Sequence, residues 1–122
     1  MRFPSGQECV TWQWIKKPNH SEYGSLLIKM FRLNRFDQSP VLLESTNSFV
    51  LELWMPSMNH GSSPTTVTKV DIGTYLVEQV FFIMPGDWEL RWHKMQPETN
   101  QILETLTLPV FISDEEFNQS SF

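Results

Sequence analysis

The sequence predicts an all-β fold, a single β-sandwich of about seven strands. Apolar and polar residues alternate with a period of two through much of the chain, most clearly in residues 49–55 and 88–92. This period is that of a half-buried strand. Gly, Pro, Asn, Asp and Ser separate the strand-like runs, and no segment has a helical period of useful length. Short strands divided by turn residues, without helices, favour a sandwich.

The first half of the chain is predicted to contribute three strands. In residues 10–14, tryptophan and valine alternate with polar residues. Residues 26–33 are apolar enough for a strand that is buried on much of both faces. Residues 49–55 alternate strictly and predict a central strand.

The second half is predicted to contribute four strands. Residues 66–70 suit a short strand, and residues 74–84 suit a long one because they are rich in β-branched and aromatic residues. Residues 88–92 predict a second central strand, and residues 102–110 an edge strand, since Pro109 cannot donate to a ladder. We expect four core residues in the central strands: Leu51, Leu53, Leu90 and Trp92.

The length of 122 residues suits one domain. We place the sandwich at residues 1–113 and expect the polar residues 114–122 to be a flexible C-terminal tail. Residues 1–4 lack the apolar region of a signal peptide, and no apolar run is long enough to span a membrane. We therefore expect no direct membrane insertion and interpret the chain as the soluble domain of a longer precursor.

Charge and cysteine content exclude several classes of function. The net charge is −5 and the basic residues are scattered, which argues against nucleic-acid binding and against electrostatic attachment to an anionic membrane. Cys9 is the only cysteine, so an internal disulfide and a multi-cysteine zinc site are excluded. No nucleophile motif surrounds Cys9, and a blue-copper centre would need a cysteine between two histidines. We expect that the protein is not an enzyme.

One part of the chain carries residues with a specific chemistry. Met55, Met58 and His60 lie within six residues at the end of a predicted strand, and Met84 precedes a Pro-Gly turn. Three thioethers and an imidazole suit monovalent copper, whereas magnesium and calcium prefer oxygen. These four residues are the candidate ligands of a Cu(I) site, provided that both strand ends lie at one pole of the sandwich.

A packing interpretation stays open beside this one. Methionine is also an adaptable core residue, and Met55 and Met84 both fall in apolar runs. Trp54 and Trp88 adjoin the methionines, either as core residues or as indoles that shield a soft metal or contact the cation.

Three other residues could supply a ligand. His93 follows a strand on the face opposite Trp92 and is expected to face solvent, and His20 is expected in a loop. The sequence does not decide whether Cys9, His20 or His93 contributes to the site.

Three motifs follow one another in order: Met-Pro-Ser-Met-Asn-His-Gly at 55–61, Gly-Thr-Tyr at 73–75, and Phe-Ile-Met-Pro-Gly-Asp-Trp-Glu-Leu at 82–90. Together they resemble the YtkA-like/FixH-like domain family, whose pattern is Met-x-x-Met-x-His-Gly, Gly-x-Tyr and Phe-x-Met-x-Gly-x-Trp. The resemblance covers roughly residues 49–93.

The resemblance implies an immunoglobulin-like or cupredoxin-like sandwich in the periplasm or another extracytoplasmic location. FixH-like members are linked to copper supply for haem–copper oxidase assembly. By position, Met55, Met58, His60 and Met84 would bind Cu(I), and Tyr75 and Trp88 would be framework residues. The expected function is that of a metallochaperone in copper trafficking, resistance or oxidase assembly.

The expected partners are the copper ion and a copper-accepting or membrane oxidase-assembly protein. The alternative is a β-sandwich protein-interaction module that binds no metal and uses the methionines for packing.

Overall fold

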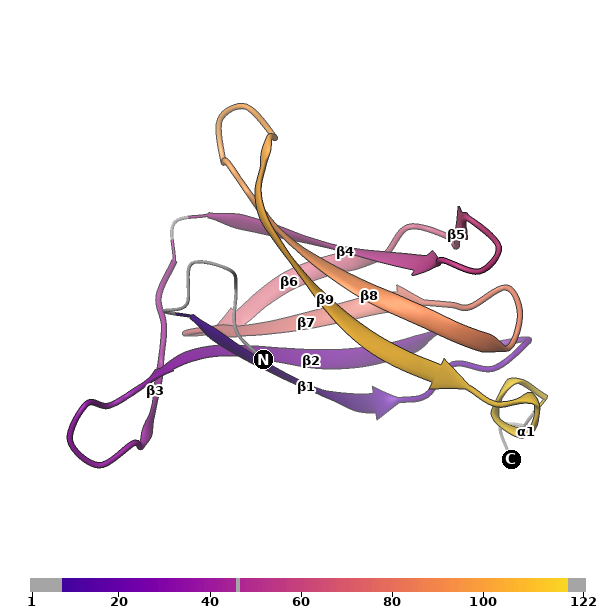
Figure 1. Cartoon of the computed structure of the whole chain (residues 1–122), viewed down its shortest axis with the longest axis horizontal. Helices are drawn as coiled ribbons and strands as arrows, with labels where there is room; N and C mark the ends of the chain where they lie inside the picture. Colours follow the sequence, from indigo (N-terminus) through magenta and orange to yellow (C-terminus); the bar gives the residue numbers. More distant parts are fainter. Residues whose placement is uncertain (1–7, 46, 119–122) are drawn as a thin grey trace.

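In the computed structural model, residues 8–45 and 47–118 are described, and they form two antiparallel sheets packed together as a β-sandwich (Figure 1). The predicted fold class is confirmed. The expectations for residues 1–4 and 119–122 lie outside the described residues. In chain order the elements are β1 (Cys9–Lys16), β2 (Gly24–Leu33), β3 (Pro40–Leu42), β4 (Ser48–Met55), β5 (His60–Gly61), β6 (Thr66–Asp71), β7 (Thr74–Val80), β8 (Gly86–Met95), β9 (Ile102–Ile112) and α1 (Asp114–Phe117).

The two sheets have a simple strand order. The five-stranded sheet runs β1-β2-β7-β6, with β3 paired to β2, and the four-stranded sheet runs β5-β4-β8-β9. The predicted central position of β4 and β8 is therefore confirmed. Leu51 lies opposite Trp92 and Leu53 opposite Leu90 in the ladder, and all four side chains are buried as predicted. Pro109 lies in β9, whose paired neighbour among the described strands is β8, so the predicted edge position is also confirmed.

Aromatic side chains join the two sheets in the core. Trp92 stacks on Phe49 of the neighbouring strand, with ring centroids 4.9 Å apart and an interplanar angle of 4°. It meets Tyr75 of the opposite sheet edge-on at 5.5 Å. Trp88 packs against Phe82 of the β7–β8 connection in a tilted arrangement, with ring centroids 5.2 Å apart. These contacts pack β8 of the four-stranded sheet against the five-stranded sheet and the β7–β8 connection.

Two details of the predicted strands are wrong. Strand β2 is buried on one face only, because Lys29 is exposed between two buried residues. The strand predicted for residues 74–84 ends at Val80, and residues 81–85 connect it to β8. The physical reason is that β7 and β8 belong to different sheets, so the chain must leave the first sheet before Gly86. Gln79, with a left-handed φ of 61°, interrupts the extended backbone at this point.

A short helix forms at the start of the segment that the sequence predicted as a flexible tail. Ser113 and Glu116 form a capping box at the start of α1. The backbone N–H and the ring Nδ1 of His20 both donate to the carbonyl of Phe117, at 2.8 and 3.0 Å. Lys17 forms an ion pair of 3.0 Å with Glu116, which, together with the capping bonds, lowers the pKa of that carboxyl. Residues 114–118 are thus attached to the β1–β2 connection.

The connections that carry the candidate ligands lie at one end of the sandwich. Figure 1 shows the β4–β5 hairpin, the β7–β8 connection and α1 at this end, and the β2–β3 hairpin at the other. The convergence of the two ligand-bearing segments at one pole agrees with the sequence prediction. None of the helices in the described part of the chain has the length and apolarity needed to cross a membrane.

Candidate metal centre

The β4–β5 hairpin holds its residues through a tight turn. Pro56 fixes the backbone φ at the first turn position. The backbone N–H of Met58 donates to the carbonyl of Met55 at 3.3 Å, and that of Asn59 to the carbonyl of Pro56 at 3.2 Å. Asn59 has a left-handed φ of 52°, a conformation that asparagine tolerates better than most residues. The turn ends where His60 pairs with Met55.

Pairing in the hairpin brings an imidazole next to a thioether. Met55 and His60 are cross-strand partners, so their side chains share one face of the sheet. That face is directed toward the core, because Met55 is only 4% exposed. His60 is half-buried, and its ring lies against Trp88 with centroids 5.7 Å apart and a tilt of 60°.

The tautomer of His60 suits a metal ligand. Its Nδ1 lies 3.2 Å from the carbonyl oxygen of Gly61, which can only accept a hydrogen bond. In the neutral ring Nδ1 therefore carries the proton, and Nε2 keeps its lone pair. No other residue in the described ranges bonds to Nε2. A histidine that binds a metal through one ring nitrogen usually donates the N–H of the other nitrogen to a carbonyl, a carboxylate or water.

The β7–β8 connection approaches Met55 closely. The indole Nε1 of Trp88 donates to the carbonyl of Met84 at 2.9 Å and fixes the turn between them. Gly86 has a φ of 135°, and a Cβ there would stand 2.5 Å from the terminal methyl carbon of Met55. Glycine is favoured there, because a side chain would be strained at this positive φ and would require the methyl of Met55 to move. Met84 is half-buried and packs against the core.

Three of the four predicted ligand residues are linked to Trp88: His60 through its ring, Met84 through its backbone carbonyl, and Met55 through its pairing with His60. Met58 lies in the turn between Met55 and His60 and is 55% exposed. Two thioethers and one imidazole form a donor set that suits Cu(I). In residues 8–45 and 47–118, no three His, Cys, Asp or Glu side chains are grouped so that they could hold a metal ion.

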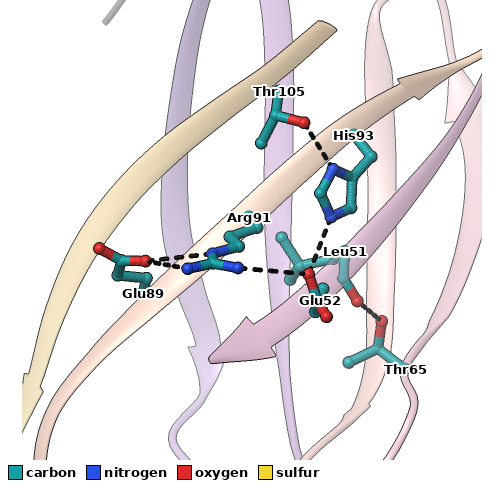
Figure 2. Close-up of polar contacts among 7 residues, drawn as sticks. All are labelled: Leu51, Glu52, Thr65, Glu89, Arg91, His93 and Thr105. Carbon is teal, nitrogen blue, oxygen red and sulfur yellow. Dashed lines mark hydrogen bonds and ion pairs between the residues drawn. The ribbon is translucent and has the colours of Figure 1, made fainter. Parts of the chain in front are cut away.

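The other candidate ligands have different contacts. His93 was expected to face solvent, but it is only 9% exposed. Its Nε2 donates to Glu52 at 3.0 Å and its Nδ1 is bonded to Thr105 at 2.7 Å, so both nitrogens are occupied (Figure 2). Cys9 is buried at the start of β1, at the opposite end of the sandwich (Figure 1). His20 is bonded to the helix as described above. None of the three is part of the centre.

Trp54 does not shield the centre, because it belongs to the outer face of the four-stranded sheet. The Arg91 guanidinium lies 5.0 Å above its ring and donates to Glu89 at 2.9 and 3.1 Å. Figure 2 shows how Glu52 connects this arginine to His93. The sequence analysis missed this network. Its signal was the alternation of Glu89, Arg91 and His93 along a strand, opposite Glu52.

Comparison with known proteins gave no matching family model, no similar curated protein and no similar solved structure. The resemblance to YtkA-like/FixH-like domains therefore rests on the three sequence motifs alone. The arrangement around Trp88 is an independent observation, since it follows from strand pairing and contacts.

Proposed function

We propose that this chain binds Cu(I) at the end of the sandwich, with the thioethers of Met55 and Met84 and the Nε2 atom of His60 as resident ligands. The observation that carries the proposal is the position of His60. The residue is paired across the strands with Met55, and its ring lies against Trp88. One ring nitrogen is fixed by a carbonyl, and the other has no partner among the described residues.

The chemistry of the surroundings favours a soft monovalent cation. Thioether sulfur is polarizable and suits Cu(I), while the donor set lacks the carboxylates that hard cations require. Trp88 is almost fully buried. Its indole excludes water from one side of the ligands, and an aromatic face attracts a cation. Thioethers and a neutral imidazole bind Cu(I) without being consumed, so the set supports metal carriage by ligand exchange.

We infer the biological role from the proposed Cu(I) binding together with the sequence resemblance. A domain that holds Cu(I) with neutral ligands near a surface can receive the ion from one protein and pass it to another. The motifs support an extracytoplasmic, periplasmic location and a partner that accepts copper or assembles a membrane oxidase. We therefore propose a metallochaperone role in copper trafficking, resistance or oxidase assembly.

The test is an anaerobic Cu(I) titration against a chromogenic competing chelator. The wild-type protein should retain one copper ion per chain. Met84→Leu keeps volume and apolarity but removes the sulfur, so it should fold normally and bind Cu(I) at least about tenfold more weakly. Met95→Leu is the matched control, because Met95 lies at the far end of β8.

Two results would contradict the proposal. The first is that the wild-type protein competes no better than a protein without methionine ligands, and the second is that Met84→Leu and Met95→Leu bind Cu(I) equally well. In either case the protein-interaction module, with the methionines as packing residues, would replace the copper carrier.

A further inference from the structure

Met58 differs from the other three candidate ligands in its exposure. Met55 is 4% exposed, whereas Met58 is 55% exposed on the same hairpin. The two residues are joined by a turn hydrogen bond of 3.3 Å, and Met58 lies two positions before His60. A thioether on the surface therefore sits on the same short turn as two resident ligands.

We propose that Met58 is the exchange ligand of the centre, the residue that first takes Cu(I) from a carrier protein and last holds it on release. This inference rests on the proposed function. Met58 belongs to the turn and to no strand, so cross-strand neighbours do not fix its side chain. An unbranched side chain with three rotatable bonds can adopt both an outward and an inward position.

Met58 is the most exposed of the four candidate ligands, since Met55 is almost fully buried and both His60 and Met84 are half-buried. A ligand of another protein therefore reaches the sulfur of Met58 more readily than that of Met55. Packing does not explain Met58, because a methionine with more than half of its surface exposed contributes little to the core and is open to oxidation. Ile83, next to Met84, is also exposed and adds apolar surface on which a carrier could dock.

The transfer is a sequence of ligand exchanges. A bond forms between Cu(I) and the Met58 sulfur while a bond to a thioether or thiolate of the carrier breaks. A bond to Met84 or Met55 then forms as the bond to Met58 breaks. The copper stays in the +1 state throughout. Only coordinate bonds form and break, so no electron is transferred. The partner is thus a Cu(I) carrier whose own soft ligands are accessible.

The experiment compares the rate and the equilibrium of transfer in Met58→Leu. Cu(I) is supplied anaerobically as its complex with bathocuproine disulfonate, and the loss of its colour is followed by stopped-flow absorbance. We expect the uptake rate to fall about tenfold or more, while the dissociation constant stays within about twofold. Since the dissociation constant is the ratio of the two rates, release should slow by the same factor. Met95→Leu should change neither quantity.

The outcomes separate this inference from the proposed function. An unchanged transfer rate in Met58→Leu, with normal binding by the wild type, overturns the exchange role alone. A loss of affinity in Met58→Leu as large as that in Met84→Leu shows instead that Met58 is a resident ligand, and it also overturns the exchange role. If the wild type binds no Cu(I), both proposals fail. Folding should be unaffected, because Met58 is largely exposed.

Discussion

Replacing Trp92 with alanine removes the side chain that connects the two sheets. Trp92 is fully buried, stacks on Phe49 and meets Tyr75 of the opposite sheet. Truncating a buried large aromatic residue costs about 3–5 kcal/mol, including the cavity that remains. Two lost aromatic pairs raise the cost, whereas loss of the indole N–H, which is buried without a partner, offsets part of it. We expect Trp92→Ala to lower the free energy of unfolding by about 4 kcal/mol.

Urea unfolding followed by far-UV circular dichroism measures this change, since the extrapolated free energy in water can be compared between variants. The matched control is Trp54→Ala, because Trp54 is only half-buried, on the outer face under Arg91. Its loss should cost less than about 1.5 kcal/mol. If Trp92→Ala costs no more than Trp54→Ala, Trp92 does not hold the sheets together as we describe.

Three further predictions concern stability and the centre. The hydroxyl of Tyr75 is buried and has no hydrogen-bond partner in the part of the chain that the structure describes, and burial raises its pKa. Tyr75→Phe should therefore stabilise the protein by about 1 kcal/mol at neutral pH. The wild type should lose stability as the pH rises above 10, which is the ordinary pKa of tyrosine, and Tyr75→Phe should lose less. Urea unfolding at neutral and alkaline pH measures this difference. The pKa of Glu116 is lowered, mainly by its bond to Lys17, so its stabilising effect is present above pH 4.5 and is lost as the pH falls through the lowered pKa. Lys17→Met should weaken that acid dependence and cost less than about 1 kcal/mol, measured by unfolding at neutral and acid pH. Gly86→Ala should cost about 1–3 kcal/mol because of its positive φ, and it should also weaken Cu(I) binding by displacing the methyl of Met55, a change that the chelator titration would detect.

The periodicity of two was sufficient to predict the main strands but not the short ones. Strands β3 and β5 contain three and two residues, too few for an alternation to be recognised. These two strands form because β2 and β4 pair with them. The sequence alone does not reveal which residues pair. The end of β7 was missed for a related reason, since the passage from one sheet to the other depends on tertiary packing and not on local composition.

The sequence was sufficient to predict that the candidate ligand residues meet at one pole, but not how deeply each of them is buried. Alternation along β4 places Met55 toward the core, and strand ends bring Met84 to the same end. Met58 is 55% exposed in a turn that contains the left-handed Asn59, and the sequence reveals neither value. His93 was correctly placed on the outer face, yet Glu52 and Thr105 of the neighbouring strands enclose it there.

X-ray absorption at the copper K edge of the Cu(I)-loaded protein tests the central proposal most directly, because it reports which atoms surround the metal. The account predicts two sulfur atoms at about 2.3 Å and one nitrogen at about 2.0 Å, values typical of first-row metal bonds to these atoms. Met84→Leu should lose one of the two sulfur neighbours. A shell of oxygen and nitrogen alone, or a sulfur shell that is unchanged in Met84→Leu, would contradict the proposed Cu(I) centre.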